Sequence, residues 1–143
     1  MENKYINRYN SLCRSLDNLE RSTVADPRAP FVLEGTAQMF NLTFDLSWKV
    51  MKDILVKHFG IVDYATGSPR ENLRLAFSNG LITDDVWLQM LKTRNNLTHD
   101  YDGTIAEAVF ENISTKYYFV FLAFQRSVEK YYKNGLSGIT SFE

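Results

Sequence analysis

The chain has 143 residues, 45% of them hydrophobic and 14% aromatic, so it is long enough to form one domain with its own core. Its formal net charge of −1 argues against tight, sequence-indifferent binding of nucleic acid through phosphate contacts, although a local basic patch could still bind RNA. One cysteine and two widely separated histidines exclude an internal disulfide and disfavour a metal site, so neither a metal nor a cofactor is expected.

The N-terminal segment is polar and lacks the apolar stretch of a signal peptide, and no run of about 18 apolar residues predicts a membrane span. Together these features indicate a cytoplasmic protein without membrane contact.

Apolar residues recur at helical spacing, and the first helix is predicted over residues 3–24. Its apolar side comprises Tyr5, Tyr9, Leu12, Leu16 and Leu19. Two prolines within residues 25–30 predict the connection to the next helix.

The second helix is predicted over residues 31–59 and is apolar around most of its circumference, so we expect it at the centre of the fold. A short third helix is predicted over residues 69–79. Ser68 can cap it, Pro69 suits its first position, and Glu71 completes a capping box.

The fourth helix is predicted over residues 84–99, with Thr83 as its N-cap. Its apolar side comprises Val86, Trp87, Met90, Leu91 and Leu97. A fifth helix is predicted over residues 104–133, and Thr104 with Glu107 forms a capping box at its start. Its apolar face is predicted to comprise Ile105, Val109, Ile113, Tyr117, Val120, Phe124, Val128 and Tyr131.

Four long amphipathic helices and one short helix with short connections predict an all-α fold, an antiparallel up-and-down helical bundle. The bundle is expected over residues 1–133, and the glycine-containing residues 134–143 are expected to form a flexible tail. The apolar side chains exceed what one such bundle can bury, and we therefore predict a two-fold homodimer.

The end of the predicted fourth helix gathers the groups best suited to chemistry: Arg94, Asn95, His99 and Tyr101. Asn95 and His99 are four residues apart and would share a helix face. Arg94 and His99 are five apart, about 140° around an ideal helix. Their side chains converge only if Arg94 reaches round the helix or if the helix loosens before the turn at residues 102–103.

These side chains offer a defined chemistry. The imidazole of His99 can exchange protons at neutral pH, and the guanidinium of Arg94 can hold a phosphate by two hydrogen bonds. Such a set suffices to cleave an RNA phosphodiester through the neighbouring 2′-hydroxyl without a metal. The alternative is structural, since a histidine near a helix C-terminus is often a partner of the helix dipole and an Arg-Asn pair is often solvated surface.

The spacing from Arg94 to His99 resembles the motif of the HEPN superfamily, and the following Tyr101 resembles its nucleotidyltransferase substrate-binding proteins. Residues 34–49 resemble that family's helix-two signature, in which Gln, Phe, Thr, an acid and Trp-Lys recur. Matching segments continue through Ser68-Pro69-Arg70-Glu71, Leu75-Ala76-Phe77, Gly80-Leu81-Ile82 and Trp87, so that the resemblance covers about residues 5–133.

The resemblance implies a dimeric helical bundle paired with a minimal nucleotidyltransferase, several such pairs acting as toxin–antitoxin systems. In that reading Arg94, Asn95 and His99 form the active set of a metal-independent ribonuclease. The nucleotidyltransferase silences it by attaching adenylate to Tyr101. The cleft is expected to receive residues from both subunits.

Two alternatives to this toxin hypothesis stay open from the sequence. In the first, the dimer is a non-catalytic subunit that binds a nucleotide or the nucleotidyltransferase in a groove lined by Gln38, Asp45, Trp48 and Arg94, although Trp48 also suits the core. In the second, the protein is a helical dimer without chemistry. Among the remaining candidates, His58 is expected to be a dipole partner at a helix end rather than a ligand.

Overall fold

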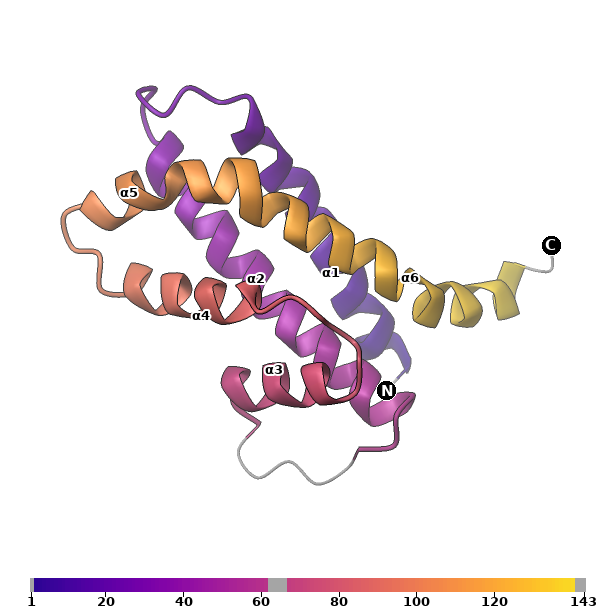
Figure 1. Cartoon of the computed structure of the whole chain (residues 1–143). Coiled ribbons are helices and arrows are strands. Elements are labelled where there is room, and N and C mark those ends of the chain that lie inside the picture. The colour runs from indigo at the N-terminus through magenta and orange to yellow at the C-terminus, as the bar shows by residue number, and fades with distance from the viewer. Residues whose placement is uncertain (1, 62–66, 141–143) are drawn as a thin grey trace.

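The computed structural model describes the backbone of residues 2–61 and 67–140 and the side chains of residues 4–61 and 67–132. The described residues form helices and contain no strand, which confirms the all-α prediction (Figure 1). The helices are α1 (Glu2–Glu20), the 3₁₀ turn η1 (Arg21–Thr23), α2 (Val32–Lys57), α3 (Pro69–Ser78), α4 (Val86–Leu97), α5 (Thr104–Asn112), the π-helical segment η2 (Ile113–Tyr117) and α6 (Tyr118–Thr140).

Helix α2 is the centre of the fold, as its apolar circumference predicts, because it contacts α1, α3, α4, α5 and α6. Helices α1 and α2 run antiparallel, and α4 runs antiparallel to the rod formed by α5, η2 and α6 (Figure 1). The short helix α3 packs beside the C-terminal part of α2. Within the described residues, no helix combines the length and apolar character needed to cross a membrane.

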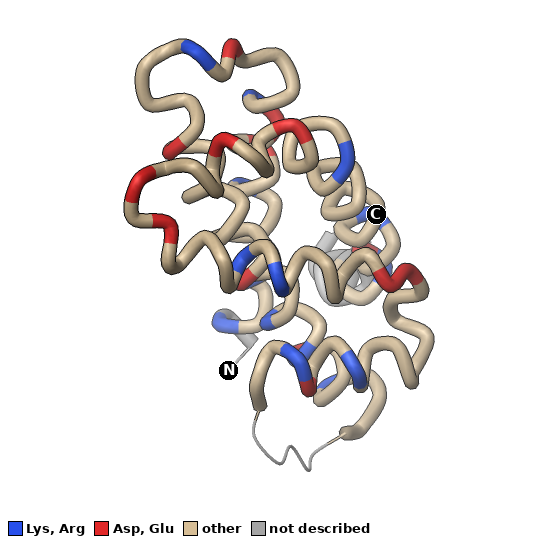
Figure 2. Tube along the Cα trace, turned by 60° about the vertical axis from the view of Figure 1, so that its left-hand side comes forward, with Lys and Arg blue, Asp and Glu red and all other residues tan. Residues whose placement is uncertain are grey.

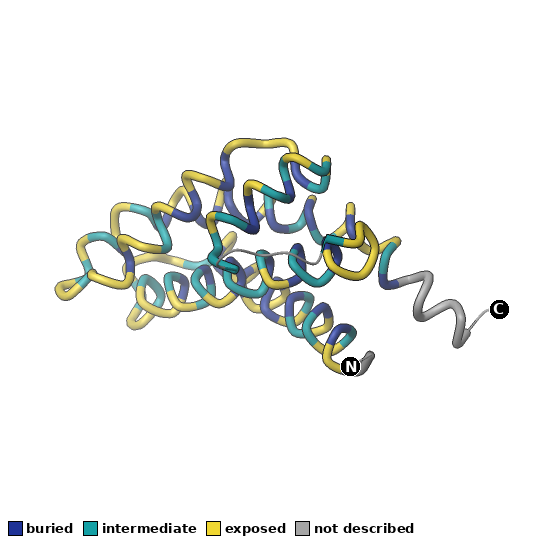
Figure 3. The backbone as a smooth tube through the Cα atoms, turned by 90° about the horizontal axis from the view of Figure 1, so that it is seen from below, coloured by how far each residue is buried: buried dark blue, intermediate teal, exposed yellow. Residues whose placement is uncertain are grey.

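The core is rich in aromatic rings. All five residues of the predicted α1 stripe are buried, and buried positions recur along each helix between exposed ones (Figure 3). Tyr132 stacks between Tyr5 and Tyr9, with ring centroids 4.4 and 4.2 Å apart. Further along the core, Trp87 of α4 lies edge-on to Phe121 of α6, at 5.7 Å. These contacts fix α4, which carries the candidate site, against the bundle.

On the predicted apolar face of residues 104–133, four residues are buried and four are partly buried against the core. The buried ones are Ile113, Tyr117, Phe124 and Val128, and the partly buried ones are Ile105, Val109, Val120 and Tyr131. Ile105 and Tyr131 are only half-buried, whereas the adjacent Ala106 and Tyr132 are buried. The prediction assumed one α-helical period throughout. Both differences displace the buried position by one residue toward the C-terminus, one before and one after the π-helical segment η2, which takes in an extra residue in one turn.

The helix starts show which predicted caps are right. At α3 the Glu71 N–H donates to Ser68 Oγ at 3.1 Å, and Pro69 is the first helical residue, as predicted. The start of α4 is corrected from residue 84 to Val86. Thr83 does not cap it, because the Val86 N–H donates instead to Asp84 Oδ1 at 2.9 Å.

Helix α6 extends beyond its predicted end at residue 133 and reaches Thr140. Glycine inside a helix costs about 1 kcal/mol relative to alanine but does not remove a backbone donor as proline does, so Gly135 and Gly138 do not break the helix. The flexibility of residues 134–143 and the homodimer stay predictions. In keeping with an interface, this single chain exposes several large apolar side chains, among them Val24, Phe31, Leu42, Tyr101 and Phe119.

Candidate functional site

The end of α4 is where the helix loosens. The helix stops at Leu97, two residues before the predicted end at His99. The His99 N–H donates to the Asn96 carbonyl at 3.0 Å, three residues back instead of four, and the Thr98 hydroxyl donates to the Asn95 carbonyl at 2.6 Å. The α-helical hydrogen bonding therefore gives way to a turn. His99 therefore lies outside the helix, and its direction is not bound by the 140° separation from Arg94.

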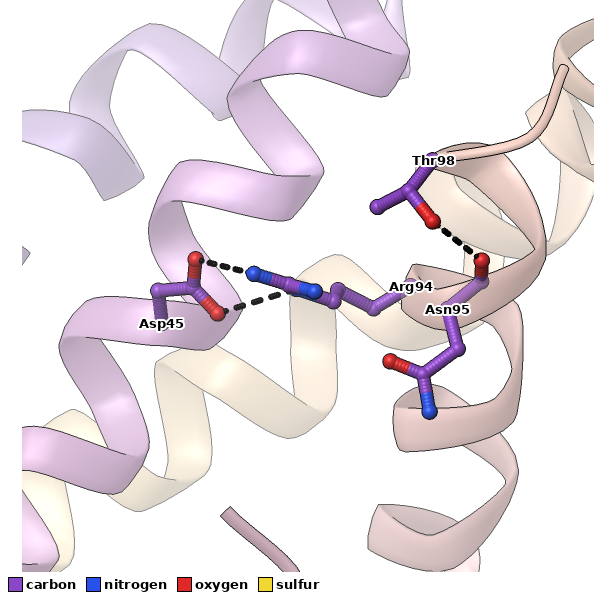
Figure 4. A network of polar contacts seen from close by, with 4 residues as sticks. All are labelled: Asp45, Arg94, Asn95 and Thr98. Carbon is purple, nitrogen blue, oxygen red and sulfur yellow. Dashed lines mark hydrogen bonds and ion pairs between the residues drawn. The ribbon is translucent and has the colours of Figure 1, made fainter. Parts of the chain in front are cut away.

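Arg94 forms a two-bond ion pair with Asp45 of α2 (Figure 4). Its Nε donates to Asp45 Oδ1 at 3.1 Å and its Nη2 to Oδ2 at 2.9 Å, a fork-to-carboxylate geometry. The side chains are 30% and 28% exposed, respectively, so the pair lies at the protein surface but is partly desolvated. The pair fixes the guanidinium while its Nη1 amino group stays available for another acceptor.

The other predicted site residues are open to solvent. Asn95 and His99 are exposed, and Tyr101 is 92% exposed. In Figure 4 the Asn95 amide makes no bond to the Arg94–Asp45 pair. Among the described residues, no hydrogen bond joins the side chains of Asn95, His99 or Tyr101 to the rest of the chain. The structure thus brings Arg94 to Asp45 and leaves the other three side chains accessible.

The loop that carries His99 and Tyr101 is anchored by the acids beside them. Asp100 accepts hydrogen bonds from the N–H groups of Ile105 and Ala106, at 3.0 and 2.7 Å, and so caps the start of α5. Asp102 accepts from the Thr104 hydroxyl at 2.8 Å, and this bond lowers the pKa of the Asp102 carboxyl. The predicted capping box at Thr104 is therefore wrong, because aspartates earlier in the loop supply the cap.

A cavity of about 400 Å³ lies beside Tyr101. Its lining includes the carboxylates of Glu34, Asp100 and Asp102 but no Lys or Arg. Gln38, a predicted groove residue, lines this cavity. The other two predicted groove residues lie elsewhere, because Asp45 pairs with Arg94 and Trp48 is half-buried against the core.

Glu34, Asn41 and Asp100 also line this cavity, and none of them was predicted as a site residue. Asn41 Oδ1 is buried and has no hydrogen-bond partner among the described residues. A signal was available, because Glu34, Gln38, Asn41 and Asp45 recur at three- and four-residue steps in the N-terminal part of α2. Such a polar stripe indicates a side of the helix that the core does not cover.

Elsewhere, the second histidine has a structural contact. Tyr5 Oη and His58 Nε2 lie 2.8 Å apart at the C-terminal end of α2. In the part of the chain that the structure describes, no group of three or more His, Cys, Asp or Glu side chains is arranged to hold a metal ion.

Comparison with known proteins gives a family and a fold. Residues 6–130 match the model of a family described as "nucleotidyltransferase substrate binding protein like". The crystal structure of a protein from Thermus thermophilus has a TM-score of 0.66 and 23% sequence identity, over 83% of this chain and 96% of that chain. At this identity the likeness shows the fold alone. No curated protein matches the sequence.

Proposed function

Because the chain belongs to the nucleotidyltransferase substrate-binding-like family, we propose that it is the helical partner of a minimal nucleotidyltransferase and a metal-independent RNA endonuclease, as in toxin–antitoxin pairs. The family is consistent with the HEPN superfamily, whose motif spans Arg94 to His99. One observation carries the proposal. An arginine fixed by a carboxylate and an exposed histidine lie at the same loosened helix end, next to an exposed tyrosine.

The proposed reaction is cleavage of RNA by its own 2′-hydroxyl. The 2′-oxygen attacks phosphorus, the bond to the 5′-oxygen breaks, and the products are a 2′,3′-cyclic phosphate and a 5′-hydroxyl. His99 takes the proton from the 2′-hydroxyl or returns one to the departing 5′-oxygen. Arg94 neutralises the charge that develops on the phosphate oxygens, and Asn95 orients the imidazole or a ribose hydroxyl. In a dimer, a second copy of the motif would supply the other proton-transfer group.

The proposed role of Asp45 is to position Arg94. Its two hydrogen bonds restrain the guanidinium, which otherwise has many rotamers, and leave Nη1 to contact a phosphate oxygen. The acidic cavity beside Tyr101 repels phosphate. The RNA backbone is therefore expected to pass on the Arg94 side of the loop.

The proposed silencing step is adenylylation of Tyr101. The phenolic oxygen attacks the α-phosphorus of ATP held by the nucleotidyltransferase, a new O–P bond forms, pyrophosphate leaves, and the phenol proton passes to a base or to water. The 92% exposure of Tyr101 suits an acceptor that must enter another protein's active site. The added phosphodiester carries a negative charge two residues from His99, where it competes with the phosphate of RNA.

Ribonuclease activity is tested with purified protein and RNA in EDTA. His99→Ala should abolish cleavage. His58→Ala is the matched control, because it removes the other histidine at a site bonded to Tyr5 and should leave the rate unchanged. Full activity of His99→Ala, or equal losses in both variants, contradicts the assignment.

Modification is tested by co-expression with the minimal nucleotidyltransferase proposed as the partner. The intact mass should rise by one adenylate per chain, and Tyr101→Phe should abolish the rise. A mass gain that persists in Tyr101→Phe contradicts the proposed acceptor.

A second function is favoured by the same ion pair. Asp45 already occupies two donors of Arg94, as expected if the guanidinium is structural and the protein is a non-catalytic subunit that presents Gln38, Asp45 and Trp48 to a nucleotide or to the nucleotidyltransferase. Stable co-purification with the nucleotidyltransferase, without cleavage of any RNA by the free protein, would support this second function and contradict the first.

A further inference from the structure

The near-zero net charge hides an uneven charge distribution. Figure 2 shows acidic positions gathered toward one end of the molecule, around the connection between α1 and α2 and the start of α5. The loop that bears Tyr101 comes directly before α5, so the proposed adenylate acceptor lies at this acidic end. The totals of 16 basic and 17 acidic residues do not indicate such an end.

The cavity of about 400 Å³ beside Tyr101, here called the Tyr101 cavity, is lined by groups that accept hydrogen bonds. The carboxylates of Glu34, Asp100 and Asp102 line it, and none of them forms an ion pair within the described part of the chain. The bonds that Asp100 and Asp102 accept come from neutral N–H and hydroxyl groups, so they leave the negative charge uncompensated. On the same lining, the buried Oδ1 of Asn41 has no donor among the described residues. Such a cavity suits a side chain that brings both N–H donors and positive charge, which is the head of a Lys or an Arg.

A second pocket, of about 560 Å³, adjoins this cavity at the start of α2 and is here called the Phe31 pocket. Gln38 lines both, so the two form one continuous surface along the N-terminal part of α2. The only charged side chain that lines the Phe31 pocket is that of Arg21. Its apolar lining residues are Leu19, Ala25, Phe31, Val32 and Met39. An apolar pocket thus lies next to an acidic cavity.

Phe31 displays its ring in an unfavourable backbone conformation. Its φ of 68° lies in the left-handed region, which side chains other than glycine rarely adopt, and the residue is 83% exposed. Burial in this chain therefore does not compensate the backbone strain. Val24, in the same connection between α1 and α2, is 88% exposed. Large apolar side chains exposed beside an apolar pocket indicate a surface that another protein covers.

An enzyme that adenylylates Tyr101 has to cover part of this end. Transfer requires the phenolic oxygen to approach the α-phosphorus to within about 3–3.5 Å, so the enzyme must enclose the ring. A stable protein–protein interface covers about 800 Å² on each partner, far more than one tyrosine ring, and therefore extends onto neighbouring surface. Along α2, the Tyr101 cavity lies between Phe31 and Asp45. The Phe31 side supplies the apolar area that the centre of an interface needs.

We propose that the nucleotidyltransferase docks on both features together, with an apolar side chain in the Phe31 pocket and a Lys or Arg side chain in the Tyr101 cavity. The identity of this partner rests on the function proposed above. The basic side chain would also neutralise the carboxylates that otherwise repel the triphosphate of ATP from Tyr101. The contact that holds the partner therefore also prepares the acceptor for transfer.

The test measures docking without modification. The purified nucleotidyltransferase is titrated by calorimetry, without ATP, into the Tyr101→Phe protein, which serves as the parent. Glu34→Lys reverses one charge of the Tyr101 cavity at a side chain that makes no hydrogen bond or ion pair among the described residues. Phe31→Gly removes the exposed ring and relieves the backbone strain. The matched controls are Glu129→Lys and Phe119→Ala, exposed residues of α6 that line neither feature.

Glu34→Lys and Phe31→Gly should each weaken binding about tenfold, whereas the controls should stay within about twofold of the parent. Binding by Glu34→Lys should also depend less on KCl between about 50 and 200 mM, because one attraction has been removed. Since Phe31→Gly relieves strain, weaker binding by this variant does not come from unfolding. Equal weakening by the variants and their controls, unchanged affinity of Glu34→Lys, or a parent that does not bind the nucleotidyltransferase overturns the proposal.

Two further measurements separate the other occupant and the proposed function. If Glu34→Lys or Phe31→Gly converts a dimer to a monomer by light scattering, the surface binds a second copy of this chain and the proposal fails. With Tyr101 restored and ATP added, intact mass reports transfer. If Glu34→Lys gains adenylate as fast as the chain with Glu34, the silencing function stands and the docking surface fails. If both docking variants bind weakly but the unsubstituted chain gains no adenylate, the docking surface stands and the silencing function fails.

Discussion

The Arg94–Asp45 ion pair gives a prediction whose size follows from its geometry. Two unit charges about 4 Å apart attract by about 4 kcal/mol at an effective dielectric constant of 20, but desolvation opposes this attraction. Exposed pairs retain about 0.2–1 kcal/mol, and breaking a buried pair costs about 3–5 kcal/mol. With two hydrogen bonds and side chains about 30% exposed, the pair should show a coupling free energy of about 1.5 kcal/mol.

A double-mutant cycle measures this coupling. Urea unfolding is followed for the parent protein, Arg94→Gln, Asp45→Asn and the double variant. The matched control cycle uses Arg28 and Asp26, whose side chains are 92% and 56% exposed and make one contact of 3.4 Å, beside a bond from the Arg28 backbone N–H that the substitution of Arg28 keeps. Their side-chain coupling should be about 0.3 kcal/mol. Raising the salt to about 1 M should reduce the Arg94–Asp45 coupling but not abolish it.

The result that refutes the reasoning is a coupling below about 0.5 kcal/mol that equals the control cycle. The pair would then be an ordinary surface contact. Asp45 could not be a positioning residue, because it would not hold the guanidinium more firmly than solvent does.

Three more predictions concern stability and are all measured by urea unfolding. Phe31→Gly should raise the unfolding free energy by about 0.5–1 kcal/mol, because Phe31 has a φ of 68° and is 83% exposed; a decrease would mean that its ring contacts outweigh the backbone strain. Asp100→Ala should lower it by about 1–2 kcal/mol through loss of the α5 cap, and an unchanged value would contradict the capping role. Burial raises the pKa of Tyr9 to about 12, so the neutral phenol stabilises the fold below pH 10 and this stabilisation disappears as the pH rises toward 12. Tyr9→Phe should show a shallower decline over that range, and identical pH profiles would contradict the shift.

The spacing of apolar residues predicted the buried face correctly in helices that keep one α-helical period over their whole length. The α1 stripe and the apolar side of α4 are buried as predicted, because each helix presents one face to the core. On the face of residues 104–133, Ile113 and Tyr117 of η2 are buried as predicted, and the differences lie outside η2, at Ile105 and Tyr131. Helical spacing alone does not decide which of two adjacent residues is covered there, because that depends on the contacts of α5 with α4 and of α6 with α1.

The candidate site was predictable in its residues but not in its contacts. The spacing of Arg94 and His99 indicated the end of α4, yet the bond from Arg94 to Asp45 joins positions 49 residues apart and depends on the packing of α4 against α2. The pocket between the N-terminal part of α1 and the C-terminal part of α2 was not predicted for the same reason, because Lys4 and Lys57 become neighbours only when these helices pair antiparallel.

The π-helical segment lets the long C-terminal rod hold one residue more than a regular α-helix that presents the same two faces. A turn that takes in an extra residue leaves α5 and α6 at the relative rotation that a shorter α-helix would give. Removing one residue from positions 113–117 should therefore be absorbed by a return to α-helical hydrogen bonding, with Phe124 and Val128 still facing the core. A deletion at the exposed Ala123 of α6 has no such outlet, because it would rotate the residues that follow by about 100°, and it should be far more harmful.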